Sequence, residues 1–184
     1  MPPKQRITRE MILEKSFAMF CREGMEAVNA RSVAKALNCS TQPIFSYFAG
    51  MDDLKNALDQ KARDAFEASI SGETSQGDPL ERSCASYVRF AGEQPCLFAH
   101  LFLRMGEAQN SPAMNSELME AIVRAEAESE GLSLDAAKEL CTSLWVFAHG
   151  LAAVQASGKN AFSAERVAEM LARLREGLVI RLKN

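Results

Sequence analysis

The sequence lacks the signals that would direct the chain into a membrane or out of the cytoplasm. It contains no run of about 18 uncharged apolar residues, the length that a membrane-spanning helix needs. Its first six residues read Met-Pro-Pro-Lys-Gln-Arg and lack the apolar stretch of a secretion signal. We therefore expect a cytoplasmic protein that makes no membrane contact.

Cysteine is scarce and shows no pairing pattern. The five cysteines are scattered, odd in number and without a C-x-x-C spacing, which argues against a disulfide framework and against a zinc site. They are Cys21, Cys39, Cys84, Cys96 and Cys141. The leading interpretation is that they are small buried apolar side chains. A thiol-based redox regulator that uses Cys96 or Cys141 remains an alternative.

Motifs for catalysis are also missing. The chain has two histidines, His100 and His149, and neither has a cysteine or a carboxylate at ligand spacing. There is no H-E-x-x-H, no G-x-S-x-G, no phosphate-binding glycine loop and no dinucleotide fingerprint. We expect a protein that is not an enzyme and needs neither a metal nor another cofactor.

Strand signals are absent, whereas helix signals run through the whole chain. Helix-capping and helix-ending residues such as Thr8, Gly24, Asn29 and Ser40 divide the chain into segments of helical length. We predict an all-α protein with about nine helices. Their approximate ranges are 8–23, 30–37, 41–47, 52–70, 79–93, 96–105, 112–130, 134–157 and 164–182. Among the predicted starts are Asp78-Pro79, Ser111-Pro112, Ser133 and Ser163.

Charge is distributed unevenly along the chain. The net charge is −3, but residues 1–50 hold seven basic and four acidic side chains. This segment therefore carries +3 and the remainder carries −6. A basic N-terminal segment on an otherwise acidic chain is expected when only that segment contacts phosphate groups.

Two short helices joined by a tight turn form the most informative segment, from Ala30 to Phe48. Residues 24–48 read GMEAVNARSVAKALNCSTQPIFSYF, and Asp52-Asp53-Leu54 opens the next helix. Together with the apolar spacing of the first helix, this stretch closely resembles the DNA-binding domain of TetR-type regulators. The resemblance implies a three-helix helix-turn-helix domain over 1–50. It implies a larger helical domain for effector binding and dimerisation over 51–184.

The resemblance also implies which residues contact DNA. Base contacts fall on Thr41, Gln42, Pro43 and Phe45, with Gln42 the best candidate for a bidentate contact to adenine. The candidates for phosphate contacts are Arg31, Ser40 and Tyr47. Ile44 and Phe48 are expected in the core instead.

Two positions depart from the family pattern. Where the family usually has lysine after the recognition helix, this chain reads Ala49-Gly50-Met51, and the aromatic pair inside the helix is reduced to Phe45-Ser46. Both departures indicate a weaker hold on the DNA backbone or an altered operator. They keep open a second alternative, a helical ligand-binding module whose DNA binding has weakened.

The C-terminal half is rich in large side chains suited to a pocket between helices. The likeliest pocket residues are Phe98, Phe102, Trp145 and His149, which would hold a partly apolar small molecule. The spacing Trp145-x3-His149-Gly150 is similar to a signature of one group of TetR-type C-terminal domains.

A stripe of apolar residues marks the last helix as core or as a dimer seam. It consists of Val167, Met170, Leu171, Leu174, Leu178 and Leu182. The resemblance implies a homodimer formed through the last two helices, which would read a pseudo-palindromic double-stranded operator. The function expected is a repressor that a small-molecule effector releases from DNA.

Overall fold

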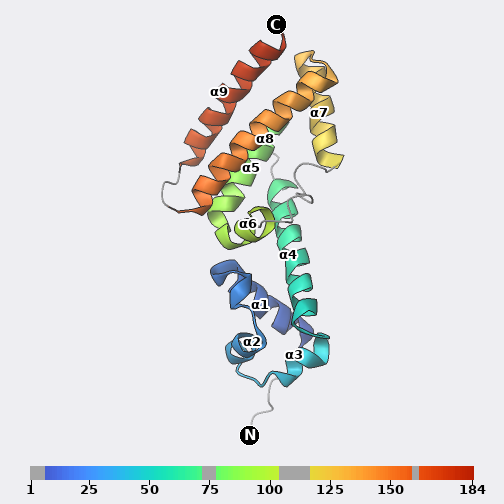
Figure 1. Cartoon of the computed structure of the whole chain (residues 1–184), viewed down its shortest axis with the longest axis vertical. Helices are drawn as coiled ribbons and strands as arrows, with labels where there is room; N and C mark the ends of the chain where they lie inside the picture. The colour runs from blue at the N-terminus through green and yellow to red at the C-terminus, as the bar shows by residue number, and fades with distance from the viewer. Residues whose placement is uncertain (1–6, 72–77, 104–116, 159–161) are drawn as a thin grey trace. The chain divides into compact units, whose positions relative to one another are not determined.

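Helices account for all regular secondary structure in the described part of the chain (Figure 1). The computed structural model describes residues 7–71, 78–103, 117–158 and 162–184. The elements are α1 (Arg9–Glu23), the 3-10 turn η1 (Met25–Ala27), α2 (Ala30–Ala36), α3 (Gln42–Tyr47), α4 (Met51–Ser71), α5 (Pro79–Glu93), α6 (Pro95–Phe102), α7 (Glu117–Glu130), α8 (Leu134–Ala156) and α9 (Ala164–Leu182). The prediction of an all-α fold is confirmed.

Several predicted helix ends are present as capping hydrogen bonds. Each of four caps accepts a hydrogen bond from the backbone N–H three residues later, over 3.0 to 3.3 Å; they are Thr8, Asp78, Ser133 and Ser163. Gly24 ends α1 with φ at 84°, a conformation that favours glycine, and its N–H donates to the Phe20 carbonyl. The predicted start at Ser111-Pro112 lies outside the described residues.

The chain divides into two compact units, Met1–Phe66 (unit 1) and Glu67–Asn184 (unit 2). Unit 1 therefore extends sixteen residues past the boundary expected after residue 50. The reason lies in α4, whose first half buries Leu54 and Leu58 completely. The Lys61 ammonium on α4 also pairs with Glu14 on α1 at 2.5 Å.

Unit 1 is built around a small apolar core shared by its short helices. Fully buried side chains come from every one of its α-helices, and include Ile12, Phe20, Val33, Ile44, Phe48 and Leu54. Helices as short as α2 and α3 are unstable alone, so this shared core fixes their geometry. Figure 1 shows α1, α2 and α3 gathered into one cluster.

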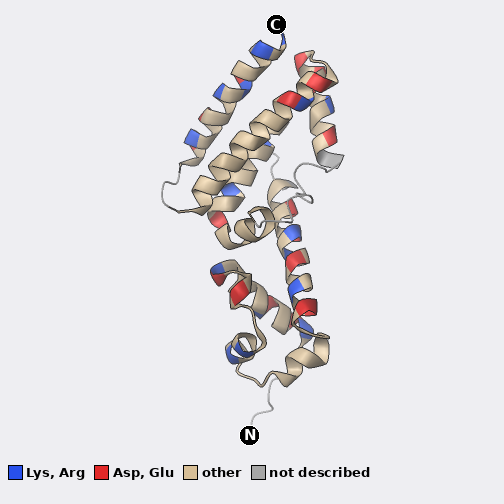
Figure 2. Ribbon diagram, in the orientation of Figure 1, with Lys and Arg blue, Asp and Glu red and all other residues tan. Residues whose placement is uncertain are grey.

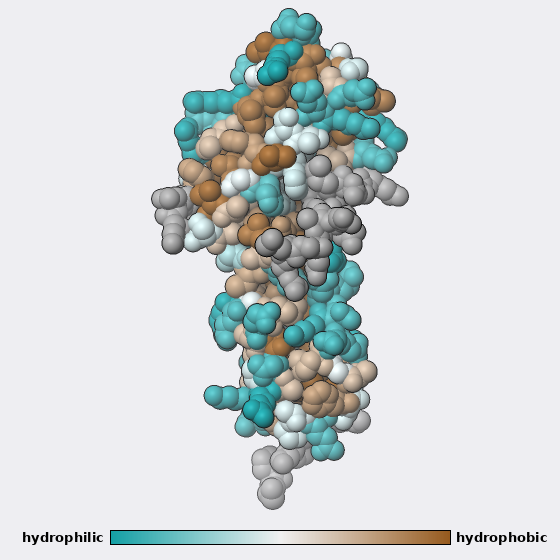
Figure 3. Space-filling view, in the orientation of Figure 1, coloured by the Kyte–Doolittle hydropathy of each residue, from teal (hydrophilic) through white to brown (hydrophobic). Residues whose placement is uncertain are grey.

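Unit 2 is organised on α5 and α8, which pack along each other (Figure 1). Helix α9 packs against both, and α7 packs against α8. The surface of unit 2 keeps several large apolar side chains exposed. On α8 and α9 they are Leu134, Val146, Val154 and Ile180. Figure 3 shows hydrophobic residues in brown on the one face that it draws. No helix within the described ranges is both long and apolar enough to cross a membrane.

A largely covered arginine, with 13% of its side chain exposed, joins three helices of unit 2. The guanidinium of Arg175 on α9 lies 2.9 Å from Asp78, the cap of α5, and 2.6 and 2.9 Å from Glu126 and Glu130 on α7. Glu81 lies 4.0 Å away. Burial raises the pKa of Glu126 to about 7. We call these five residues the arginine cluster; it links the start of α5 and the end of α7 to the middle of α9.

Candidate functional site

The turn between α2 and α3 is set by local hydrogen bonds. Asn29 and Ser32 form a reciprocal capping box at the start of α2, with bonds of 3.0 and 3.1 Å. Asn38 takes the left-handed conformation, with φ at 52°, as the sequence predicts for this turn. The Cys39 N–H then donates to the Ala34 carbonyl at 3.0 Å. These contacts define the direction in which the chain enters α3.

Helix α3 begins one residue later than predicted. Its N-cap is Thr41, so the expectation that Ser40 caps the helix is wrong. Thr41 already has helical backbone angles, which keep its side chain from accepting the usual capping bond. Pro43 lies in the first turn, as predicted, where a missing N–H costs nothing. The hydroxyls of Ser40 and Thr41 are thus not used in capping α3.

Helix α3 separates a buried face from an exposed face. Ile44 and Phe48 are buried as predicted, whereas Gln42 is exposed and Phe45 exposes 51% of its surface. The helix carries no charged residue, as Figure 2 shows, and α2 contributes two basic residues to unit 1. One of them is Arg31, a predicted phosphate contact, which is exposed. The exposed face therefore offers amide, aromatic and hydroxyl groups, which suit recognition of base edges.

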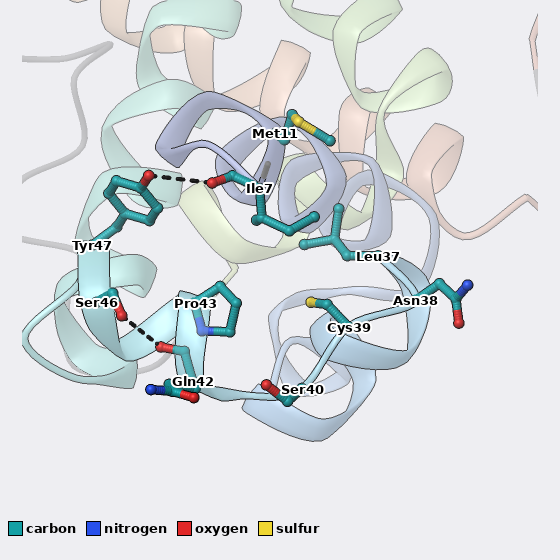
Figure 4. Close-up of a pocket in the computed structure, with 10 residues that line it drawn as sticks. All are labelled: Ile7, Met11, Leu37, Asn38, Cys39, Ser40, Gln42, Pro43, Ser46 and Tyr47. Atoms are coloured by element: carbon teal, nitrogen blue, oxygen red, sulfur yellow. Dashed lines mark hydrogen bonds between the residues drawn. The ribbon is translucent and has the colours of Figure 1, made fainter. Parts of the chain in front are cut away.

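A groove of about 890 Å³ runs beside this face and brings most of the predicted contact residues together (Figure 4). Its lining comes from the start of α1, the turn and α3, and comprises Ile7, Met11, Leu37, Asn38, Cys39, Ser40, Gln42, Pro43, Ser46 and Tyr47. Arg31, Thr41 and Phe45 are not part of this lining.

Tyr47 has a contact that the sequence does not reveal. Its hydroxyl donates to the Ile7 carbonyl at 3.2 Å, which links the end of α3 to the residues before α1 (Figure 4). A tyrosine hydroxyl has one proton to donate, and a phosphate oxygen only accepts. A phosphate contact by Tyr47 would therefore compete with the bond to Ile7, and it stays a prediction.

In unit 2, the four predicted pocket residues lie together. Phe98 and Phe102 on α6 meet Trp145 and His149 on α8, and Tyr87 on α5 contacts all four. Ring centroids from Tyr87 lie at 5.5 Å from Phe98, 5.1 Å from Phe102, 6.3 Å from Trp145 and 6.1 Å from His149. We call these five residues the aromatic cluster. Tyr87 was missing from the predicted set because nothing in the sequence indicates which α5 residue faces His149.

A hydrogen bond of 2.8 Å joins the Tyr87 hydroxyl to His149 Nδ1. Burial raises the pKa of Tyr87 and lowers the pKa of His149, so both side chains are neutral at neutral pH. In that state the hydroxyl donates to Nδ1 in the tautomer that carries its proton on Nε2, and it accepts from the Nδ1–H in the other tautomer. The pair thereby fixes the orientation of the imidazole ring.

Trp145 supplies an unused hydrogen-bond donor within the aromatic cluster. Its ring stacks on His149 with centroids 5.3 Å apart, yet its buried Nε1–H has no partner among the described residues. A buried donor without an acceptor is unfavourable by about 1–3 kcal/mol. Phe98 is different, because it is wholly buried and belongs to the core. The cluster thus combines a fully buried core side chain with one buried donor that has no partner among the described residues.

Two cysteines are poor candidates for redox chemistry. Burial raises the pKa of the Cys84 and Cys141 thiols to about 12, which disfavours the reactive thiolate. Cys141 is therefore unsuited to the redox role considered from the sequence, whereas Cys96 is half-buried. Within the described ranges, no group of histidine, cysteine and acidic residues is arranged to hold a metal ion.

Comparison with known proteins gives a consistent result. Residues 80–178 match the family model described as "Tetracyclin repressor-like, C-terminal domain". No curated protein matches the sequence closely enough to count as a relative.

Solved structures with this fold are regulators of low sequence identity. A TetR-like transcriptional regulator from Rhodococcus sp. has 15% identity and a TM-score of 0.66, with 92% of this chain and 96% of that chain covered. A TetR-family regulator from Streptomyces coelicolor has 20% identity and a TM-score of 0.66, with 95% and 87% covered. A ketosteroid transcriptional regulator from Mycobacterium tuberculosis has 14% identity and a TM-score of 0.55, with 94% and 96% covered.

Proposed function

The chain belongs to the TetR family of transcriptional regulators, and we propose that it acts as a homodimeric repressor that a small-molecule effector releases from its operator. The observation that carries this proposal is the exposed face of α3. Gln42 and Phe45 point away from a fully buried Ile44 and Phe48, so they can enter a major groove without disturbing the core.

Dimerisation through α8 and α9 is supported by apolar surface on both helices. Within the predicted stripe, Val167 and Leu171 are buried, whereas Met170, Leu174, Leu178 and Leu182 stay only half-buried. Val146 on α8 and Ile180 on α9 each expose 58% of their surface. A twofold partner would cover these side chains. A dimer also carries two recognition helices, and a pseudo-palindromic operator offers two half-sites about 34–36 Å apart.

Release by an effector needs only a modest preference for one conformation. A ligand that binds the two states with affinities about 100-fold apart shifts their equilibrium by about 2.7 kcal/mol. We assign its site to the aromatic cluster, where the unpaired Trp145 Nε1–H would donate to an acceptor atom on the ligand. The ligand would then be flat, partly apolar and equipped with an oxygen or nitrogen acceptor.

Replacing Gln42 with alanine tests the DNA-reading role of α3. We expect binding to the operator to weaken by about 1–3 kcal/mol, because a bidentate contact to one adenine is lost, with base preference relaxed at that position. Fluorescence anisotropy on the upstream promoter DNA and on single-base variants measures this effect. Gln60→Ala on α4 is the control, since the Gln60 amide binds Asp64 within its own helix. Equal binding of wild type to operator and scrambled DNA would contradict the proposal.

Trp145 allows the effector site to be observed directly, because it is the only tryptophan in the chain. We expect any compound that releases the DNA to change Trp145 fluorescence with the same midpoint. His149→Ala should lower the affinity for that compound by about 2- to 13-fold, since a stacked aromatic pair contributes about 0.5–1.5 kcal/mol. Thr142→Ala, an exposed change on the same helix, should leave the midpoint unchanged. DNA release without any fluorescence change would place the effector elsewhere.

A further inference from the structure

The segment that follows the recognition helix lacks a positive charge. Residues 49–53 read Ala-Gly-Met-Asp-Asp, and the Ala49 N–H donates to the Asp53 carboxylate at 3.0 Å. A helix that docks into a major groove has phosphate groups on both sides, and contacts to them set its register. On this side of α3, the chain therefore needs a cation from another element.

Arg9, the first residue of α1, lies beside this segment. Its guanidinium carbon is 4.9 Å from the centre of the Phe48 ring, and Phe48 is the residue that ends α3. Phe48 is 1% exposed and belongs to the core of unit 1, so its ring offers a well-packed platform for the cation. Arg9 itself is exposed, and no carboxylate of the described residues lies within ion-pairing distance of it.

The start of α1 is also tied to α3 by a second contact. The Tyr47 hydroxyl binds the Ile7 carbonyl two residues before Arg9. Ile7 and Arg9 thus contact consecutive residues at the end of α3. A guanidinium held over a ring keeps its N–H donors at its edge, where they can bind a phosphate in bidentate fashion. The position of the cation relative to α3 is therefore set before DNA binds.

We propose that Arg9 binds a DNA phosphate next to the C-terminal end of α3 and takes the role of the basic residue absent from positions 49–51. This inference rests on the proposed function. Tyr47 contributes as a positioning residue through its bond to Ile7, which also accounts for its hydroxyl proton. The phosphate-binding surface of unit 1 thus includes the start of α1 as well as the helix-turn-helix.

Changing Arg9 to glutamine is the test, measured as the dependence of operator affinity on salt. Each lost phosphate contact makes the slope of log affinity against log salt shallower by about 0.9. We therefore expect the slope to become shallower by about 0.9 for each unit 1 that is bound to DNA. Affinity should fall roughly tenfold for each bound unit 1, and by the same factor on the operator and on its single-base variants. Arg9→Lys should keep the wild-type slope because it keeps the charge.

Two further variants make the result decisive. Arg22→Gln removes an exposed arginine at the other end of α1, where Arg22 pairs with Glu23, and should leave the slope unchanged. Adding Met51→Lys to Arg9→Gln should restore the slope by returning a cation to the start of α4. A weaker Arg9→Gln complex with an unchanged slope, or an equal slope loss in Arg22→Gln, would overturn the Arg9 proposal alone. Wild type that binds all DNA equally would overturn the proposed function as well.

Discussion

Replacing Arg175 with methionine is expected to lower the free energy of unfolding by about 3–5 kcal/mol. Methionine keeps most of the side-chain length and removes the charge. The arginine cluster then holds carboxylates on α5 and α7 without the cation that compensates them, and Glu126 is only 1% exposed to water. Urea denaturation of the full chain, followed by circular dichroism, measures the loss.

A matched control lies on the same helix. Arg173 is two residues away, exposes 69% of its side chain and pairs with Glu169 alone among the described residues, so Arg173→Met should change stability by less than about 0.5 kcal/mol. Equal losses in the two variants would show that the arginine cluster is not what stabilises unit 2.

The dependence on pH gives a second check of the same cluster. Because burial raises the pKa of Glu126 from 4.5 to about 7, the folded state holds this proton more tightly than the unfolded state. The stability gained from protonation is present below about pH 4.5 and is lost as the pH rises to about 7. The effect of Arg175→Met should therefore be smaller near about pH 5, where carboxylates accept protons, than near about pH 8.

Phe98→Ala is expected to cost about 3–5 kcal/mol of folding stability, measured in the same denaturation assay. Phe98 is completely buried and lies within 6.0 Å of the rings of Tyr87, Phe102 and His149. Truncation leaves a cavity that the neighbouring rings can fill only in part. The sequence predicts Phe98 as a pocket residue, whereas its complete burial assigns it first to the core.

Phe102 is the natural comparison, one turn further along α6. It is half-buried, so Phe102→Ala should cost clearly less stability while altering the Trp145 fluorescence response to an effector. A loss below about 1 kcal/mol for Phe98→Ala, together with a lost effector response, would return Phe98 to the pocket wall.

Local signals in the sequence were sufficient to predict most of the helices. Caps such as Thr8, Asp78 and Ser163 act within one turn, so the local sequence contains all the information needed to predict where these helices begin. The same holds for the turn at Asn38. The exception is the start of α3, where the backbone of Thr41 is already helical and shifts the cap away from Ser40. That shift depends on how α3 packs, which local signals do not determine.

Contacts between distant residues could not be predicted in the same way. Four of the five members of the aromatic cluster were expected from residue type, but Tyr87 meets His149 across 62 positions of sequence. Arg175 reaches Asp78, Glu126 and Glu130 from a different helix, and Arg9 reaches Phe48 from the start of the chain. The domain boundary also depends on packing, because α4 is one continuous helix of which the residues up to Phe66 belong to unit 1.

The division of α3 into a buried and an exposed face has a consequence for evolution. Ile44 and Phe48 are constrained by the core, but exposed positions such as Gln42, Phe45 and Ser46 contribute little to folding stability. Mutations there can accumulate without unfolding the protein. After a gene duplication, two copies could acquire separate operators by a few changes on this face while keeping one scaffold. The target repertoire of such a lineage can therefore diverge faster than its architecture.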